Sequence, residues 1–551
     1  VLPGGASAVV KVEHTDARGE RVLVRRGVVA GENVMSAGDD LMLGDVALPA
    51  GTRLAPADIG VLAAAGEIDV EVWRRPTVGI VSTGDEVRPA GAELEPGQIH
   101  DVNGPFLAAA VERAGGLASA LGIVRDDRQE IEAALLAATS SCDLVLSSGS
   151  TSAGAGDVVY RILQERGELL VHGIKLEPGK PTVIARLAGV PFFGLPGNPA
   201  SAAVVFETLV APLLRSAGGV HASPERLRLR ASLTSDIRPA PGRHMLRMVG
   251  VVGRGETARA YPVEKRSGAI SLLAQADGFV EVPEDAGRVV AGSEVEVWLF
   301  QDRAALPDAL LMGSHCLGLR PLFTALAPLV TRSVHVGSLG GVRAVARGIA
   351  DAAGVHLREP DGSYNVAALE RMGIAGVVLV RGYRRRQGWI VAAGNPRGWT
   401  GIAGLVDGGG RIVNRVAGSG TRILLDELLG EEARRRGVPP SALAGRLAGF
   451  DVEAASHSAV AAAVKAGLAD CGLGIEAAAS LNGLGFVPVA EERYDFLLRT
   501  ETLGSPFGEA LRRALPAASF RAAIELLPGY HADPSGGEVV WRAGPHEPNP
   551  Q

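Results

Sequence analysis

Several short loops in this chain combine glycines, hydroxyl side chains and carboxylates, the residue types that bind phosphates and divalent cations. The longest is residues 147–157, Ser147-Ser148-Gly149-Ser150-Thr151-Ser152-Ala153-Gly154-Ala155-Gly156-Asp157. Its glycines and hydroxyls allow successive backbone N–H groups to face one anion. Because a simple turn needs far fewer residues, we favour a phosphate site here over a surface turn.

Two further loops carry adjacent acidic residues, Ser82-Thr83-Gly84-Asp85-Glu86 and Arg125-Asp126-Asp127. Each follows an apolar stretch that predicts a strand, and carboxylates at strand ends hold the divalent cations that phosphoanhydride chemistry needs. Asp101-Val102-Asn103 stands just before a predicted helix. Its polar residues fit a helix cap and a ligand contact equally well.

Lys180 supplies a positive charge in a second anion-binding region. Its setting, Pro178-Gly179-Lys180-Pro181, superficially resembles a Walker A loop, but Pro181 stands where a Ser or Thr should hold magnesium. This excludes a P-loop NTPase. Pro196-Gly197-Asn198 precedes a predicted helix, and a helix N-terminus together with a lysine suits the phosphate of a nucleotide or pterin.

The pattern around these loops predicts a mostly parallel sheet. Apolar stretches at residues 78–81, 144–146 and 190–193 alternate with helical patterns at residues 106–114, 128–138, 158–166 and 201–214. Such alternation gives a sheet covered by helices on both faces. Loops at the carboxyl ends of its strands gather at one edge, where these folds bind ligands.

Composition limits the classes of protein that remain. The 551 residues predict several domains. The net charge of −6 means that there is no excess of basic residues to bind nucleic acid or an anionic membrane. Three distant cysteines form neither a disulfide framework nor a zinc motif. No apolar run approaches the ~20 residues that span a bilayer, so we expect a cytoplasmic protein.

The order of these motifs, from Ser82-Thr83-Gly84-Asp85-Glu86 to Leu195-Pro196-Gly197-Asn198-Pro199, closely resembles that of the molybdopterin molybdenumtransferases, including the E domain of gephyrin. The resemblance covers about residues 1–302. It implies an α/β multidomain fold: a remnant of N-terminal β and linker domains (1–75), a three-layer molybdopterin-binding domain (76–222) and a small β-barrel-like domain (223–302). A two-lobed ligand-binding domain (303–533) and a flexible tail (534–551) follow.

The resemblance implies insertion of molybdate into adenylylated molybdopterin, with release of AMP and help from Mg²⁺. It assigns catalysis to Asp157, Asp126, Glu86 and Lys180, and the metal to Glu86, Asp126 and Asp157. The residues that it implies for substrate binding are Thr83, Gly84, Asp85, Asp101, Asn103, Ser148, Gly149, Ser152, Pro196, Gly197, Asn198 and Ser267.

Several features depart from the family pattern. Val102 replaces a hydroxyl residue, residues 153–156 are unusually small, and Glu177 occupies a position that is often basic, with Lys175 close by. The family works as a homodimer whose active site uses N-terminal segments that have no counterpart here. We therefore expect that further chain precedes Val1.

Three of the strings that stand out after residue 303 are Gly354-Val355-His356-Leu357, Asn414-Arg415-Val416-Ala417-Gly418-Ser419-Gly420-Thr421-Arg422 and Ala469-Asp470-Cys471-Gly472-Leu473-Gly474. With them, residues 303 to about 515 resemble the periplasmic-binding-protein-like domains that are fused to these transferases and to some molybdate-responsive regulators. An oxyanion or a pathway ligand would suit the expected site, which comprises Ser338, Ser419, Thr421, Arg422 and His457. Simple capping is an equal interpretation of Ser338 and Thr421. A structural role is the commoner one for His356 and His457, and Arg384-Arg385-Arg386 reads as a solvated loop.

Two functions from different classes remain. The first is a transferase whose appended domain captures or senses molybdate, tungstate or a pterin intermediate. The alternative is a non-catalytic regulatory protein that binds molybdate, tungstate or a pterin. The acidic trio of Glu86, Asp126 and Asp157 favours catalysis, because an anion binder gains nothing from carboxylates at its site. The related adenylyltransferase shares the α/β fold but lacks the flanking β regions.

Overall fold

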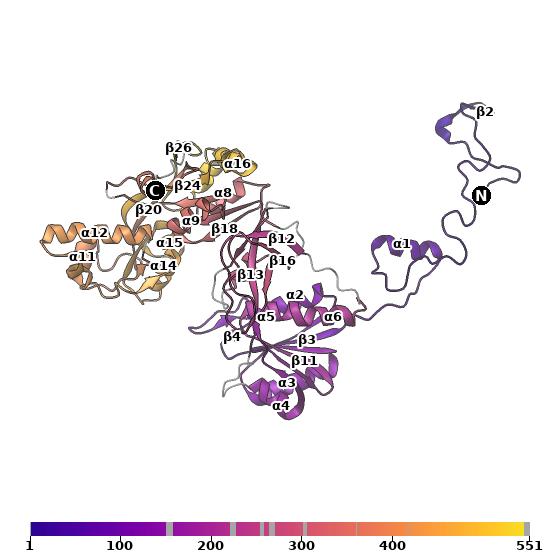
Figure 1. Cartoon of the computed structure of the whole chain (residues 1–551), viewed down its shortest axis with the longest axis horizontal. Coiled ribbons are helices and arrows are strands. Elements are labelled where there is room, and N and C mark those ends of the chain that lie inside the picture. Colours follow the sequence, from indigo (N-terminus) through magenta and orange to yellow (C-terminus); the bar gives the residue numbers. More distant parts are fainter. Residues whose placement is uncertain are drawn as a thin grey trace.

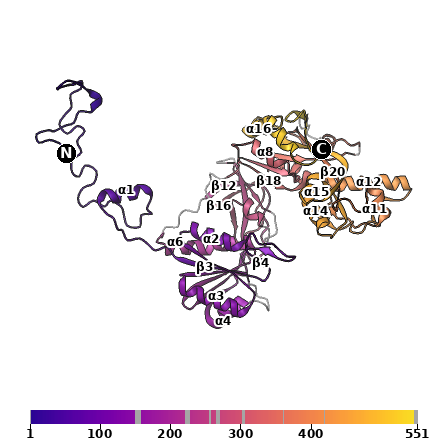
Figure 2. The same ribbon diagram turned by 180° about the vertical axis from the view of Figure 1, so that it is seen from behind.

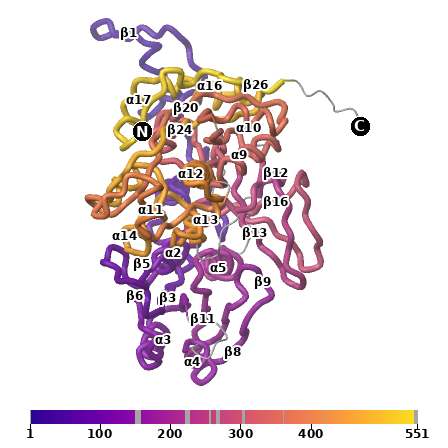
Figure 3. The backbone as a smooth tube through the Cα atoms, turned by 90° about the vertical axis from the view of Figure 1, so that its left-hand side faces the viewer, coloured from indigo at the N-terminus to yellow at the C-terminus, as the bar shows by residue number. Residues whose placement is uncertain are grey.

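The computed structural model describes residues 2–149, 158–220, 228–253, 258–263, 270–300, 306–359, 361–417 and 419–544. Three packed domains follow an extended N-terminal arm (Figure 1). In Figure 1 a β-barrel (β12, β13 and β16) lies between an α/β domain and the C-terminal domain, and in the side view of Figure 3 its strands stand at one side of the molecule.

The N-terminal arm, residues 2–75, extends away from the rest of the chain (Figures 1 and 2). It contains the short helix η1 (Val12–His14), the hairpin of β1 (Thr15–Arg18) and β2 (Arg21–Val24), and α1 (Pro56–Ala65). No residue of these four elements is buried. Many apolar side chains of the arm are therefore exposed, among them Val12, Met35, Leu43, Ile68 and Trp73.

The α/β domain is built on a six-stranded sheet in the order β6-β3-β7-β11-β10-β8. The strands are β3 (Thr77–Thr83), β6 (Leu117–Val124), β7 (Leu144–Ser148), β8 (Gly167–His172), β10 (Val183–Leu187) and β11 (Val190–Leu195). The first four in the sheet order run parallel, and β10 is antiparallel to both of its neighbours. The strands β4 (Val87–Arg88) and β5 (Ile99–His100) form a small separate pair.

Helices cover both faces of this sheet, as the alternation predicts (Figure 1). On one face lie α2 (Asn103–Arg113), α5 (Pro199–Val205), η2 (Phe206–Val210) and α6 (Ala211–Ala217); on the other lie α3 (Arg128–Ser141) and α4 (Val158–Arg166). Successive residues of β3 point to opposite faces, so Ile80 packs with the first group and Val81 with the second. Within the described residues one helix, Pro199–Ala217, is long and apolar enough to cross a membrane. More than half of its apolar stretch (56%) is buried inside the protein, as in a core helix.

The next domain is a closed barrel of five strands. They are β12 (Arg228–Leu233), β13 (His244–Val252), β14 (Arg259–Pro262), β15 (Gly278–Val282) and β16 (Glu294–Leu299), with the short helix α7 (Ser271–Gln275). Closure occurs because β14 pairs with both β12 and β13. The short strand β9 (Leu176–Glu177) of the α/β domain pairs with β13 and so ties the two domains together.

The C-terminal domain has a central sheet in the order β18-β17-β19-β24-β20-β23, with β25 and β26 added to β20. Its long strands β20 (Val377–Val391) and β24 (Gly485–Arg499) are antiparallel. The other strands are β17 (Ala309–Gly313), β18 (Thr331–His335), β19 (Ala352–Val355), β21 (Asn414–Arg415), β22 (Glu453–Ala454), β23 (Cys471–Ile475), β25 (Tyr530–Ala532) and β26 (Val539–Arg542). The helices are α8 (Leu319–Ala325), α9 (Gly337–Ala346), α10 (Val366–Arg371), α11 (Ile402–Gly408), α12 (Gly420–Arg436), α13 (Pro440–Ala444), α14 (His457–Lys465), α15 (Glu476–Leu481), η5 (Thr502–Gly504), α16 (Pro506–Ala514) and α17 (Ala518–Glu525).

One largely buried and one partly exposed ion pair join the barrel to the C-terminal domain. Arg332 of β18 pairs with Asp277, and Arg259 of β14 lies 2.7 Å from a carboxylate oxygen of Asp351. Asp277 is only 4% exposed. Charged groups that are removed from water are stable only when paired, so these contacts fix how the two domains meet.

Candidate active site

The loops that carry the predicted chemistry meet at one edge of the α/β sheet. The parallel strands β3, β6, β7 and β11 end at Thr83, Val124, Ser148 and Leu195. Direct contacts join neighbouring loops: Thr83 Oγ1 donates to the carbonyl of Ser148 (3.3 Å), and the N–H of Gly149 donates to the carbonyl of Leu195 (3.3 Å). The sheet therefore brings together glycines and hydroxyls from distant parts of the sequence.

Asn103 is the central polar contact among these loops. It lies at the start of α2 and is 7% exposed. Its side-chain amide donates to Ser148 Oγ (2.7 Å) and to the carbonyl of Gly197 (2.8 Å). One side chain thus holds the loops after β7 and β11 in a fixed relation, while its Oδ1 atom is buried without a partner.

Asp101 makes the contacts of a helix cap. Its Oδ1 accepts from the N–H of Gly104 at the start of α2 (3.0 Å), and its Oδ2 accepts from Ser82 Oγ (2.8 Å). Asp101 therefore makes the contacts of a helix cap, and Asn103 joins the loops after β7 and β11. A ligand contact by either residue stays a prediction.

Gly149 allows the loop after β7 to approach β3 closely. Its φ is +99°, and a Cβ there would lie 2.7 Å from the carbonyl oxygen of Thr83. An L side chain would need both a strained backbone and a displaced strand end. The glycine is therefore required by this packing.

The acidic side chains lie in exposed loops at the same edge. Asp85 Oδ1 accepts from the N–H of Asp126 (3.3 Å) and lies 3.5 Å from Arg125 Nε, so the loops after β3 and β6 are in contact. Glu86 is also exposed. Among the described residues no three His, Cys, Asp or Glu side chains are grouped closely enough to hold a metal. The predicted residues Ser152, Asp157 and Ser267 lie outside the described residues.

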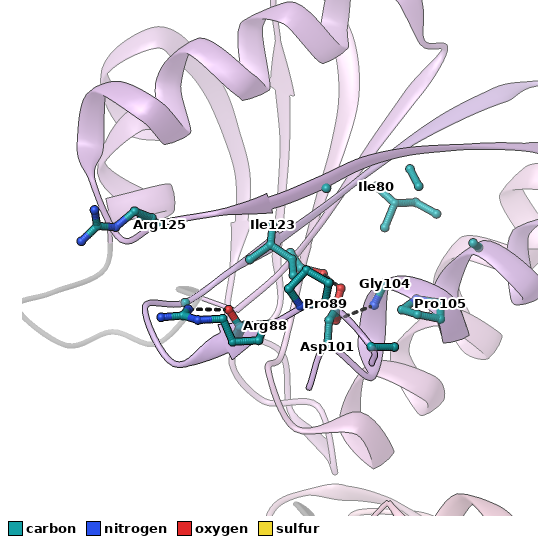
Figure 4. Close-up of a pocket in the computed structure, with 15 residues that line it drawn as sticks. Ile80, Arg88, Pro89, Asp101, Gly104, Pro105, Ile123 and Arg125 are labelled. Carbon is teal, nitrogen blue, oxygen red and sulfur yellow. Dashed lines mark hydrogen bonds between the residues drawn. The ribbon is translucent and has the colours of Figure 1, made fainter. Parts of the chain in front are cut away.

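A cavity of about 540 Å³ opens between β3, β6 and α2 (Figure 4). Arg88 and Arg125 line one end of it, and Ile80 and Pro105 line the other. Arg88 Nη1 donates to the carbonyls of Asp85 (2.9 Å) and Val87 (2.8 Å), which orients its guanidinium beside the acidic loop. Sequence reasoning did not select Arg88, although its place two residues after Glu86 was a usable signal.

Lys180 and Glu177 lie in the segment that leads into β10. Because β10 is antiparallel to β11, this segment reaches the same edge as the carboxyl ends of the parallel strands, and Lys180 is exposed there. Glu177 lies on β9, with Oε2 3.7 Å from Arg243 Nη1 of the barrel domain. Arg243 therefore compensates the negative charge of Glu177, and no local sequence pattern indicates this partner.

The predicted C-terminal ligand residues divide into two groups. Ser419 caps α12, with its Oγ accepting from the N–H of Arg422 (3.3 Å), and Ser338 Oγ accepts from the N–H of His356 (3.2 Å). Thr421 and His457 are 1% and 2% exposed, and Thr421 Oγ1 and His457 Nδ1 are buried without hydrogen-bond partners. These two side chains are the predicted residues that most need a ligand.

Arg422 has partners of its own. Its Nε lies 3.1 Å from Asp426 Oδ1, and its guanidinium lies over the ring of Phe450, 4.6 Å from the centroid. A role for Arg422 in ligand binding stays a prediction.

The prediction of a solvated loop at residues 384–386 is wrong. These arginines lie within β20, and Arg385 is fully buried. In the register of the long strands Arg385 faces Glu492 of β24, and Arg385 Nε donates to Glu492 Oε1. Burial raises the pKa of Glu492, but the charge of Arg385 and the contact with His356 outweigh this effect and lower it, so Glu492 is ionised. A run of arginines therefore predicts exposed side chains only where the fold brings no carboxylate against them.

Four parts of the chain match known protein families. Residues 1–66 match the "MoeA N-terminal region (domain I and II)" and residues 79–216 a "Probable molybdopterin binding domain". Residues 230–300 match the "MoeA C-terminal region (domain IV)", and residues 321–515 match a "PBP superfamily domain". The fold and these matches thus define a chain of the MoeA type, with an α/β domain of the molybdopterin-binding kind, fused to a PBP-like domain.

Curated relatives specify the family further. The chain is 35% identical to molybdopterin molybdenumtransferase 2 of Mycobacterium tuberculosis over 305 residues, which is 54% of this chain and 74% of the relative. The enzyme of that name from Haemophilus influenzae is 30% identical over 300 residues, with 54% and 74% covered. A solved structure of a molybdopterin biosynthesis protein from Pyrococcus horikoshii is 37% identical, covers 55% of this chain and 74% of its own, and has a TM-score of 0.47. The chain belongs to the molybdopterin molybdenumtransferases, a family of enzymes of molybdenum cofactor biosynthesis.

Proposed function

We propose that this chain inserts molybdate into adenylylated molybdopterin and releases AMP. The observation that carries the proposal is the meeting of the loops after β3, β6, β7 and β11 at one edge of the sheet, held by the contacts of Asn103. Ligands of open α/β sheets bind at this edge. Molybdate or tungstate is the second substrate.

Within this site the side chains divide into anion binders and acids. Lys180 and the backbone around Gly149, Pro196, Gly197 and Asn198 bind phosphate or molybdate oxygens. Thr83, Gly84, Asp85, Asp101, Ser148, Ser152 and Ser267 complete the proposed substrate-binding residues. Asp126, Asp157 and Glu86 are the proposed catalytic acids. Arg88 and Arg125 add positive charge at one end of the neighbouring cavity.

The exposed carboxylates suit Mg²⁺. This ion is commonly bound by one or two carboxylates together with substrate phosphates, and the acidic loops after β3 and β6 are in direct contact through Asp85 and Asp126. Glu86, Asp126 and Asp157 would hold the ion, which would neutralise charge on the phosphoanhydride. Asn103 and Gly149 keep the phosphate-binding loops in place beside them.

We propose that the protein works as a homodimer in the cytoplasm. The exposed apolar side chains of the N-terminal arm support a partner surface, because isolated elements that bury nothing are not stable alone. The resemblance to this family implies an active site near the subunit boundary. We also propose that the C-terminal domain binds an oxyanion or a pathway ligand, which supplies or regulates the transferase.

The deciding experiment is molybdate-dependent AMP release from adenylylated molybdopterin by the full-length protein with Mg²⁺. Asp157→Ala and Asp126→Ala are expected to abolish release. Asp127→Ala is a matched control, because Asp127 caps α3 through the N–H groups of Gln129 and Glu130 and so should lose stability but not turnover. No release by folded protein that still binds molybdate would refute the transferase and leave the regulatory alternative.

A further inference from the structure

The C-terminal domain contains a buried cluster of polar atoms that lack partners. The charges of Arg385 of β20 and Arg415 of β21 act on each other and on His457 of α14. Thr421 of α12 follows Gly420, which lies against His356, and we call these four side chains, Arg385, Arg415, Thr421 and His457, the arginine cluster. These side chains are between 0% and 8% exposed. Arg385 Nη2, Arg415 Nε, Thr421 Oγ1 and His457 Nδ1 are all buried without hydrogen-bond partners. Buried polar groups are costly when they lack hydrogen bonds, so the presence of several in one place requires an explanation.

The cluster carries more positive than negative charge. Both oxygens of Glu492 are already engaged: Oε1 accepts from Arg385, and Oε2 accepts from Gln387 and lies 3.2 Å from His356 Nδ1. The guanidinium of Arg415 has no carboxylate within 4 Å among the described residues, and its Nη1 donates only to the carbonyl of Ala454. Burial, together with repulsion from Arg385, lowers the pKa of Arg415 to about 10, which leaves it charged at neutral pH.

The first residues of two helices, α12 and α14, lie beside this cluster. Arg415 pairs with Ala454 across β21 and β22, only a few residues before His457 begins α14. Gly420, the first residue of α12, is so close to His356 that a Cβ would lie 2.7 Å from its Nδ1. Burial and the charges of Arg385 and Arg415 hold the pKa of His457 well below its ordinary value, so its imidazole is neutral. The arginine cluster is therefore surrounded by hydrogen-bond donors and contains one uncompensated cation, the guanidinium of Arg415.

We infer that the arginine cluster binds one small tetrahedral oxyanion, with Arg385, Arg415, Thr421 and His457 as its direct ligands. The inference rests on the proposal that the C-terminal domain takes an anion, and it names the residues and the class of ligand. Molybdate and tungstate belong to this class, as do sulfate and inorganic phosphate. The almost complete burial of every ligand atom favours a free ion over the phosphate of AMP or a pterin, because a large substituent would need an open path.

The alternative is that Arg415 is only structural. A structural arginine stabilises the folded protein, whereas an uncompensated one destabilises it until its anion binds. Arg415→Gln separates these roles, because glutamine can still donate to the carbonyl of Ala454 but removes the charge that Arg385 repels. Arg434→Gln is the matched control, since Arg434 lies exposed in the last turn of α12.

Calorimetric titration of the full chain with molybdate, tungstate, sulfate, phosphate and AMP tests the inference. The transferase site also takes molybdate, so titrations are repeated with Lys180→Gln, which weakens that site alone. We expect an oxyanion to bind with one site that Lys180→Gln keeps and Arg415→Gln weakens at least tenfold. Arg434→Gln should bind as the unchanged chain does. Thr421→Val, which keeps the shape of the side chain, should also weaken binding.

Thermal unfolding provides the second measurement. Without anion, Arg415→Gln should melt no lower than the unchanged chain, and the rise in melting temperature on adding the anion should disappear. Three results would overturn the inference: no inorganic oxyanion binds outside the transferase site, AMP alone binds, or Arg415→Gln keeps full affinity. Each is independent of AMP release, so failure of the transferase proposal is distinguishable from failure of this one.

Discussion

Replacing Asn103 with alanine tests the contact that holds the candidate active site together. The side chain is 7% exposed and donates hydrogen bonds to Ser148 Oγ and to the carbonyl of Gly197. A net contribution of about 1 kcal/mol for each bond, with a further cost for the buried Ser148 Oγ left unpaired, gives a loss of roughly 2–3 kcal/mol. For a domain of this size such a loss lowers the melting temperature by about 4–12 °C.

Local measurements show where this stability is lost. Hydrogen exchange should become faster in β7 and β11, whose following loops Asn103 joins, and stay unchanged in the C-terminal domain. The kcat/KM for AMP release should fall about tenfold or more, because displaced phosphate-binding loops no longer align the substrate. The control is Asn482→Ala, since that amide bonds only to the carbonyl of Ala478 one turn earlier. If Asn103→Ala melts and exchanges as the unchanged chain does, the proposed role of the contact is refuted.

Three further predictions follow from buried contacts. Gly149→Ala should lower both melting temperature and activity, whereas Gly189→Ala should cost only the strain of its positive φ, because nothing lies within 4 Å of its added Cβ. Arg332→Gln leaves Asp277 buried without its cation and should cost about 3–5 kcal/mol by urea unfolding, and an unchanged midpoint would contradict the ion pair as a domain link. Burial lowers the pKa of His457 below its ordinary 6.5, so the contribution of His457 to the free energy of unfolding is present above that pH and is lost as the pH falls. His457→Asn should reduce the slope of unfolding free energy against pH in this acid range by up to about 1.4 kcal/mol per pH unit. Equal slopes for the two proteins would disprove this prediction.

The sequence by itself determined the α/β domain and the edge at which its candidate site lies. Apolar strands that alternate with helices allow a parallel sheet, and in such a sheet the loops after the strands must share one edge. Thr83, Asp126, Ser148 and Gly197 were selected on that ground, and each stands in a loop or strand end at that edge. Local patterns were sufficient because each of these residues is adjacent in sequence to the strand that positions it.

Only the tertiary structure decided which polar residues are partnered. The sequence predicted a solvated Arg385 because its partner Glu492 is 107 positions away, and only the register of β20 and β24 brings the two residues together. In the sequence Glu177 stood at a position that is often basic, which suggested the loss of a positive charge. In the structure β9 places Glu177 against Arg243 of the next domain. Burial and pairing depend on contacts between distant strands, which no local spacing encodes, so the arginine cluster became visible only in the folded chain.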